Sequence, residues 1–167
     1  VFQLSMACML IIATIVIYTQ FNYLMKFDLG YNDKNIGRVN VGRIDKEKLA
    51  LFANELMKNP AIEKVTANQG GEWGTIAQVN NGTEINFDFK IIDHNYFPLF
   101  EIPVKKGRNF SPDLASDTAE GAMVNEAFVA KAGWKDPIGE KVDFFYNNKK
   151  YTVIGVIKDY HYASLSQ

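Results

Sequence analysis

The pattern of apolar and polar residues separates a long apolar start from a mixed remainder. Residues 1–25 contain no Asp, Glu, Lys, Arg or His. A helix needs about 20 residues to cross a hydrocarbon core of roughly 30 Å, so residues 2–21 are long enough to span a bilayer. The pattern therefore predicts a transmembrane helix, whose apolar centre consists of Leu10, Ile11, Ile12, Ile15, Val16 and Ile17.

Two alternatives to a membrane span remain open on the sequence alone. A secretory signal peptide would begin with basic residues and end at a small-residue cleavage site, whereas bulky residues follow Ala13 and Thr14. A buried core helix is the second alternative, although such helices are usually apolar on one stripe only. The chain begins at Val1 rather than Met, and we therefore expect a fragment whose orientation-setting charges lie upstream.

The helical pattern continues beyond the predicted span. Ile17, Phe21 and Leu24 follow helical spacing, which predicts an amphipathic stalk that ends at Leu29-Gly30 with a left-handed glycine. The aromatic side chains of this region either form an interfacial belt at the membrane surface or pack against the domain that follows. The aromatic residues at the expected position of the belt are Tyr18, Phe21 and Tyr23.

The next segment has the pattern of a β-α-β unit. Residues 37–44 alternate between apolar and polar side chains, which predicts a strand. Asp45 is a suitable N-cap for a helix that ends at Asn59-Pro60, and residues 62–67 resume as a strand. A helix between two strands favours parallel pairing of those strands in one sheet.

A glycine-rich segment and a hairpin follow. Residues 69–74 predict a loop, but they lack the lysine and the spacing of a nucleotide-binding loop. Asn81-Gly82 is a strong hairpin signal between strands at residues 75–79 and 83–92. The residues expected to face the core from the second strand are Ile85, Phe87, Phe89 and Ile91.

The last third of the chain predicts short elements separated by turns. A polar segment at residues 111–121 is expected to be a solvated connector, and Gly133 to end a short helix. The other expected elements are a helical turn at residues 96–100, a strand at 122–125, a helix at 126–132, a turn at 136–139 and strands at 141–146 and 151–157.

Composition narrows the functional classes. The chain has 167 residues, 47% of them hydrophobic, and a formal net charge of −1. This length and hydrophobic content suffice for one domain with a core. The near-zero net charge and the scattered charged residues argue against nucleic-acid binding. The single cysteine, Cys8, lies in the apolar start, so neither a disulfide framework nor a thiol pair for redox or zinc chemistry is expected.

The sequence offers no convincing catalytic or metal-binding motif. His94 and His161 are the only imidazoles and lack ligand spacing, and no G-x-S-x-G motif is present. The remaining candidates are interpreted as surface carboxylates: Asp113, Asp117 and Glu120 for calcium, and Asp143 with Asp159 or Glu101 with Asp113 as acid–base pairs. We therefore expect no enzyme activity, metal or cofactor in this chain.

Three segments in the same order resemble a known family. They are GRNFS at residues 107–111, VNEAFVAKAGWKDPIG at 124–139 and VIGVIKDYHYASL at 153–165. Together with the apolar start, they resemble the MacB-like periplasmic core domain of MacB/FtsX-like ABC transporter permeases. The expected fold is α+β, with a transmembrane and stalk helix in residues 1–29 and a two-lobed periplasmic domain in residues 30–167. That domain would combine β-α-β and β-hairpin elements and be truncated at its C-terminus.

The resemblance also implies function and partners. It implies a permease subunit of the inner (plasma) membrane with four membrane helices, in a homodimer or heterodimer. ATP would be bound by a separate or fused cytoplasmic ATPase subunit, and a periplasmic adaptor or another envelope protein would be a further partner. The domain would couple ATP hydrolysis to movement outside the membrane in export, efflux or envelope processes. The residues expected to transmit this movement are Tyr18, Phe21 and Leu24.

Two other functions remain as alternatives. An extracytoplasmic sensor domain of a membrane receptor would also follow a membrane span, but a single second span and a signalling module would come after it. Three further spans downstream of Gln167 would favour the permease. A membrane-tethered hydrolase would need convergent histidines and carboxylates, which the two histidines disfavour.

Overall fold

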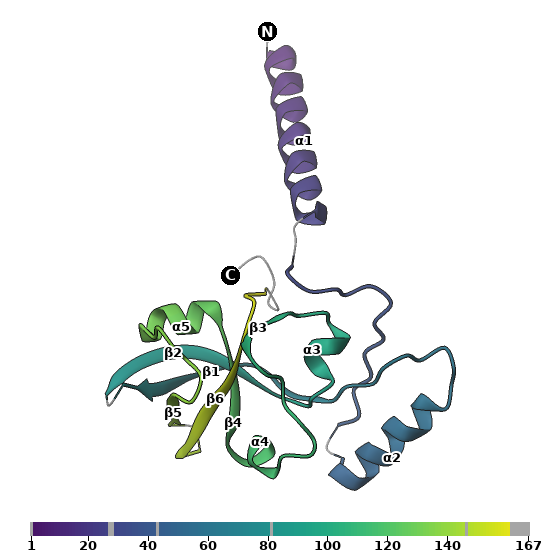
Figure 1. Ribbon diagram of the computed structural model, residues 1–167. Helices are drawn as coiled ribbons and strands as arrows, with labels where there is room; N and C mark the ends of the chain where they lie inside the picture. The colour runs from purple at the N-terminus through teal and green to yellow at the C-terminus, as the bar shows by residue number, and fades with distance from the viewer. Residues whose placement is uncertain (1, 27–28, 43, 81, 146, 161–167) are drawn as a thin grey trace. The chain divides into compact units, whose positions relative to one another are not determined.

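The computed structural model describes residues 2–26, 29–42, 44–80, 82–145 and 147–160 (Figure 1). The described residues form two compact units. One is the N-terminal segment up to Leu29, and the other, which we call the head, is Gly30–Tyr160. The predicted α+β class is confirmed, since the head combines a sheet with short helices.

Helix α1 (Phe2–Lys26) forms the N-terminal unit. It contains neither Pro nor Gly, and its 25 residues form one continuous α-helix, as predicted for the span and the start of the stalk. The Thr14 hydroxyl donates to the Leu10 carbonyl at 2.8 Å, so this polar group is satisfied within the helix. The described part of the helix runs to Lys26, residues 27–28 lie outside the described residues, and Gly30 has the left-handed φ of +79° that was predicted for the helix stop.

The head contains a six-stranded sheet among its described residues. The strand order is β2-β1-β5-β6-β3, and β4 pairs with β6. Only the β4–β6 pair is parallel among the described pairs. The strands are β1 (Asn68–Val79), β2 (Thr83–Ile92), β3 (Val104–Gly107), β4 (Gly121–Asn125), β5 (Lys141–Phe144) and β6 (Lys149–Ile157).

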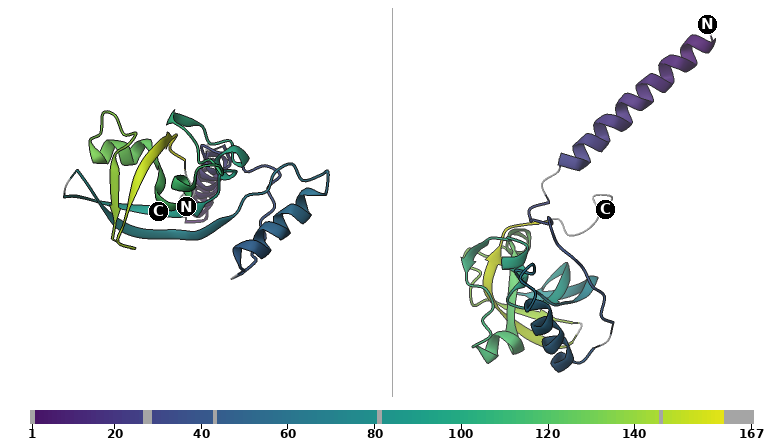
Figure 2. Two further views of the ribbon diagram at one scale, coloured as in Figure 1. Left: turned by 60° about the horizontal axis from the view of Figure 1, so that its bottom comes forward. Right: turned by 90° about the vertical axis from the view of Figure 1, so that its right-hand side faces the viewer.

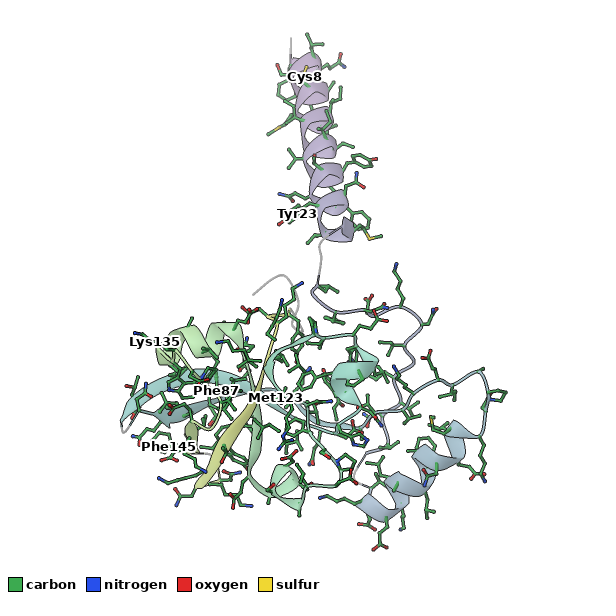
Figure 3. The ribbon with its side chains drawn as sticks, viewed as in Figure 1. Cys8, Tyr23, Phe87, Met123, Lys135 and Phe145 are labelled. Atoms are coloured by element: carbon green, nitrogen blue, oxygen red, sulfur yellow. The ribbon has the colours of Figure 1, made fainter. Side chains whose placement is uncertain are left out.

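The predicted hairpin is confirmed as β1 and β2. Val79 lies opposite Thr83, and the Gly82 amide donates to the Val79 carbonyl at 3.2 Å. Asn81 lies outside the described residues. The predicted core side of β2 holds for Ile85, Phe87 and Phe89, which are buried or half-buried (Figure 3 shows Phe87). Ile91 is exposed instead, because the register shifts between Gln69 and Trp73, and Ile92 packs inward.

The predicted β-α-β unit is wrong. Helix α2 (Lys46–Met57) forms where expected, but the described residues of 37–44 and 62–67 pair with no strand. Val39, an apolar residue of the alternating segment, is 66% exposed. Alternation buries one side of a segment only when the segment pairs with a sheet. Residues 69–74, predicted as a loop, belong to β1 because β2 supplies the pairing partner. None of the residues of α2 is buried.

Two apolar clusters form the core. The first joins the sheet to α5 (Glu126–Ala132), where the rings of Phe128 and Phe87 meet edge to face at 5.5 Å. The second surrounds α3 (Tyr96–Leu99), with Tyr96, Phe97, Ile102 and Ile157 buried. In Figures 1 and 2, α2 lies on the other side of the head from α5. The core therefore depends on the sheet, α3 and α5.

The remaining predictions for the last third are mostly confirmed. The helical turn, the short strand, the helix ended by Gly133 (φ +69°) and both later strands form near their predicted bounds. The exception is the connector, where α4 (Ala115–Glu120) forms. It is not fully solvated, because Asp117 is only 5% exposed.

Candidate functional site

All predicted membrane and stalk residues lie on α1. Residues 2–25 have a mean hydropathy of 2.0 in their most apolar window, and none of that window is buried. By length and composition, α1 is the one helix of the described residues that could cross a membrane. Exposure of the whole window differs from the burial that a core helix would show. The exposed residues include Leu10, Ile11, Ile12, Ile15, Val16, Ile17, Tyr18, Phe21 and Leu24.

The first and last described segments of the head lie next to each other. Residues 30–32 enter the head and residues 158–160 leave it, and we call their contact the terminal junction. Gly30 lies so close to the leaving segment that an added Cβ would come within 2.9 Å of the Asp159 carbonyl oxygen and 3.2 Å of the Tyr160 Cα. Its φ of +79° also favours glycine. Both observations make this position sterically demanding.

Aromatic rings fill the terminal junction. The Tyr31 ring meets the rings of Phe100 and Tyr160 edge to face, with centroid distances of 5.7 and 6.1 Å. Phe100 in turn lies 4.7 Å from the ring of Tyr96. Burial raises the pKa of Tyr96, and a side-chain hydrogen bond with Tyr160 acts in the opposite direction. The rings thus join the entering segment, the leaving segment and α3.

Backbone hydrogen bonds reinforce this arrangement. The Asn32 amide donates to the Phe100 carbonyl at 2.9 Å, and the Lys158 amide donates to the Pro103 carbonyl at 3.1 Å. The leaving segment is also bonded to α5, because the Asp159 carboxylate accepts from the Ala127 amide at 3.0 Å. A carboxylate at a helix N-terminus satisfies an amide that has no partner within the helix.

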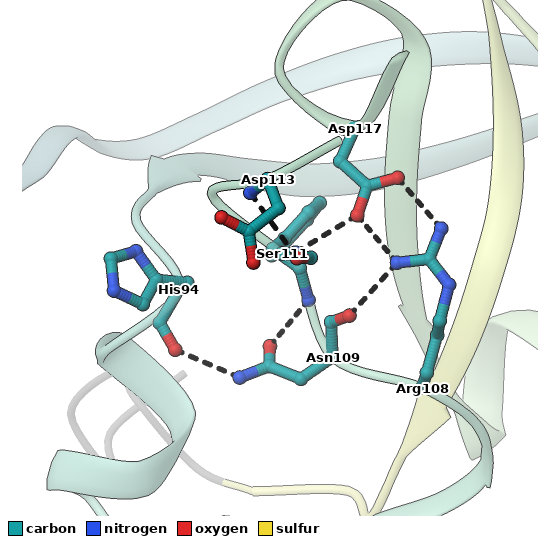
Figure 4. A network of polar contacts seen from close by, with 7 residues as sticks. His94, Arg108, Asn109, Ser111, Asp113 and Asp117 are labelled. Atoms are coloured by element: carbon teal, nitrogen blue, oxygen red, sulfur yellow. Dashed lines mark hydrogen bonds and ion pairs between the residues drawn. The ribbon is translucent and has the colours of Figure 1, made fainter. Parts of the chain in front are cut away.

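A polar network lies beside α3 and α4 (Figure 4). Arg108 Nη1 and Nη2 donate to the Asp117 carboxylate at 2.5 and 2.8 Å, and the Ser111 amide donates to it at 2.9 Å. The hydrogen bonds from Arg108 lower the pKa of Asp117, against the opposing effect of burial. Asn109 Nδ2 extends the network to the His94 carbonyl at 2.8 Å. Asp117 is thus a buried structural anion.

A second polar cluster joins the segment before β1 to the start of α3. Asp93 accepts from the Thr66 hydroxyl, and its Oδ2 accepts from the Ala67 amide at 2.8 Å. Asn95 Nδ2 donates to the Val65 carbonyl at 3.2 Å. Residues 65–67 are therefore attached to the turn that precedes α3.

The described residues that were considered for catalysis or metal binding make structural contacts instead. His94 takes part in the polar network through its backbone carbonyl, and His161 lies outside the described residues. Asp143 pairs with Lys150 at 3.0 Å, whereas Asp159 caps α5. Within the described part of the chain, no three His, Cys, Asp or Glu side chains gather where they could hold a metal ion. Sequence reasoning missed the terminal junction, for which Gly30 was the only signal.

The chain matches one family over almost its whole length. The sequence profile described as MacB-like periplasmic core domain matches residues 4–166. No curated protein is a significant match to the chain.

Solved structures agree with this match. The periplasmic region of MacB from Actinobacillus actinomycetemcomitans has 27% identity and a TM-score of 0.54, over 66% of this chain and 50% of that one. The extracellular domain of the noncanonic ABC-type transporter YknZ from Gram-positive bacteria has 19% identity and a TM-score of 0.52, over 64% and 55%. The matches thus span about half the length of these solved chains.

Proposed function

Because the chain belongs to the MacB-like periplasmic core domain family of ABC transporter permeases, we propose that its head is the non-catalytic output domain of a permease subunit. In this proposal, a separate or fused cytoplasmic ATPase binds and hydrolyses ATP. The head then acts outside the membrane on a cargo or on a partner, such as a periplasmic adaptor or another envelope protein, in export, efflux or envelope processes. The observation that carries the proposal is the family match over residues 4–166. It favours a permease over a sensor domain.

Helix α1 is the membrane anchor in this proposal. Its six central Leu, Ile and Val residues each favour insertion by about 0.3 to 0.6 kcal/mol, or roughly 2 to 4 kcal/mol together. One charge at the helix centre would cost about 2.5 to 3.5 kcal/mol, and the segment before Lys26 carries none. The head would then lie on the extracytoplasmic side of the inner (plasma) membrane.

Coupling requires a stiff element between the ATPase and the head. Shifting a two-state equilibrium from 1:99 to 99:1 takes about 5.5 kcal/mol, which a flexible linker would dissipate. Helix α1 has no Pro or Gly to interrupt its hydrogen bonds. We assign transmission of movement to Tyr18, Phe21 and Leu24, which lie on the second half of α1.

The test uses the complete permease, with its ATPase, in nanodiscs. Phe145 is 53% exposed on the head, so Phe145→p-acetylphenylalanine provides a spin-label site without a cysteine. The output is the ATP-dependent change in distance between the labels of a permease dimer. Asn22→Pro should abolish this change while ATP hydrolysis and membrane insertion continue, because proline breaks an α-helix at a cost of about 3 kcal/mol.

Two matched variants complete the test. Asn22→Ala also removes the side-chain amide of Asn22 but keeps the backbone N–H and the helix, so the ATP-dependent distance change should persist. Phe21→Ala should weaken the output more than Tyr23→Ala, because two residues along a helix place these side chains about 160° apart. A full distance change in Asn22→Pro would contradict the proposal.

A further inference from the structure

We infer that the terminal junction is a permanent clamp, through which the head moves as one rigid body with the chain segments that enter and leave it. This inference rests on the proposed function, since it identifies where movement of α1 reaches the head. The clamp consists of Gly30, Tyr31, Phe100 and Tyr160.

The first argument is that both connections of the head attach to the same short segment, which lies between α3 and β3. The entering segment bonds to the Phe100 carbonyl and the leaving segment to the Pro103 carbonyl, only three residues further along the chain. Tyr31 packs on both Phe100 and Tyr160. A force applied to the entering segment is therefore delivered to the short region from α3 to β3. The leaving segment, which continues β6, is bonded to the same region.

The second argument is the close backbone packing at Gly30. The entering backbone lies against the backbone of Asp159 and Tyr160, so a Cβ at position 30 fits only if the Asp159 carbonyl shifts. Close backbone contact leaves no room for the two segments to slide past each other without separating. The junction should therefore be either closed or broken, with no graded intermediate.

The third argument is that the clamp is anchored to the core. Tyr31, Phe100 and Tyr160 pack against the buried cluster of α3, which includes Ile157 of β6. Asp159 bonds to the first turn of α5, whose Phe128 belongs to the other cluster. Four peptide units join Lys26 to Gly30, and an extended chain of that length spans at most about 14 Å. A displaced α1 would thus load the clamp before it loads any other described part of the head.

A redox-reversible variant of the complete permease tests the clamp. Gly30→Cys and Tyr160→Cys are combined with Cys8→Ala, which removes the cysteine of α1, and with the Phe145→p-acetylphenylalanine label. A Cβ built at Gly30 lies 3.3 Å from the Tyr160 Cβ, close to the roughly 3.5 to 4.5 Å separation across a disulfide. When reduced, this variant lacks the Tyr160 ring and carries a Cβ at position 30 that displaces the Asp159 carbonyl, so it should lose most of its ATP-dependent distance change. Oxidation of the same sample should restore the change.

Single substitutions provide a second, independent measurement. Tyr31→Ala removes two ring contacts, and we expect the equilibrium ratio of closed to open junctions to fall by roughly two- to tenfold for each. Tyr31→Phe retains the ring and should behave as the unmodified protein does. Tyr151→Ala serves as the control, because this ring lies 4.7 Å from the ring of Phe144, which packs against the first core cluster rather than the cluster of α3. It should leave the output unchanged.

The outcomes distinguish the clamp from the proposed function. If the unmodified permease shows no ATP-dependent distance change, the proposed function fails and the clamp fails with it. If it shows the change and the reduced cysteine pair shows it equally, the clamp alone is overturned. The clamp is also overturned if oxidation blocks the change, because the junction would then have to open during the cycle.

Discussion

Replacing Asp117 should lower the free energy of unfolding of the head, and the contacts of the Asp117 carboxylate indicate by how much. The carboxylate is 5% exposed and accepts three hydrogen bonds, two from Arg108 and one from the Ser111 amide. In Asp117→Ala, the Ser111 amide loses its acceptor, which costs about 1 kcal/mol. The Arg108 side chain is 46% exposed and can turn to water, so loss of the ion pair adds only about 1 kcal/mol. We expect a total of about 2 kcal/mol.

Conservative and reciprocal changes should separate these contributions. Asp117→Asn keeps an oxygen for the Ser111 amide and should cost about 1 kcal/mol. Arg108→Met leaves a buried carboxylate without its counter-charge, so this variant should be less stable than Asp117→Asn. Asp113→Asn, an exposed change in the same connector, is the matched control and should have no effect.

The pH dependence provides a further check. The hydrogen bonds from Arg108 lower the pKa of Asp117 in the folded head. Its contribution to the free energy of unfolding is therefore fully present above the unfolded value of about 3.9, and it is lost as the pH falls through the lower folded pKa. The stability difference between the unmodified protein and Asp117→Asn should be constant near neutral pH and should shrink below about pH 4.

Urea unfolding in detergent micelles, followed by tryptophan fluorescence, measures these differences. Both tryptophans of the chain, Trp73 and Trp134, belong to the head, so α1 contributes no signal. The Trp134 indole donates to Asn80 Oδ1 at 2.6 Å and should report the loss of native packing. The reasoning is refuted if Asp117→Asn and Asp113→Asn agree within about 0.5 kcal/mol, the usual range for surface substitutions. An undiminished difference at pH 3 would refute the pKa argument.

Two further predictions use the same unfolding measurement. Gly155→Ala should destabilise the head by about 1 to 3 kcal/mol, because its Cβ would press on the Arg108 carbonyl, whereas Gly37→Ala, with open space around it, should not; equal effects would contradict this. Asn125→Ala should cost about 1 kcal/mol, because the N-cap oxygen that accepts from the Phe128 amide is lost, and Asn125→Asp should retain most of the stability; an unaffected Asn125→Ala would argue against the cap.

Elements that depend on nearby residues were predictable from the sequence. The β1–β2 hairpin follows from its turn residues and from alternation in β2. Helix α5 is bounded by the Asn125 cap and by Gly133 in the left-handed conformation, and both signals lie next to the helix. In each case the decisive contacts join residues within one hairpin or one helix.

Elements that require a distant partner were not predictable. Residues 37–44 have the alternation of a strand, but alternation does not say whether a neighbouring strand exists. Conversely, the glycines of residues 69–74 favour a loop, yet β2 pairs with this segment on both sides of an irregularity, at Gln69 and at Trp73, and the segment is part of β1. Strand formation depends on pairing, which local propensity does not encode.

The same reason hid the candidate site. Tyr31, Phe100 and Tyr160 are separated by about 60 residues or more, and no periodicity connects them. Gly30 was predicted as a helix stop, and its positive φ is confirmed, but its structural reason is the close approach of Asp159. Asp117 was interpreted as a solvated charge. Its burial against Arg108 was not predictable, because it depends on the fold of the connector.

Helix α3 links the terminal junction to the rest of the head. Its first residue, Tyr96, packs on Phe100 of the junction, and the two residues that bind residues 65–67, Asp93 and Asn95, immediately precede it. Since none of α2 is buried, the segment that carries α2 depends on this polar attachment more than on apolar packing. A helix of four residues has few internal hydrogen bonds, so its position is determined by its neighbours. The junction and the attachment of residues 65–67 are therefore parts of one contact system centred on α3.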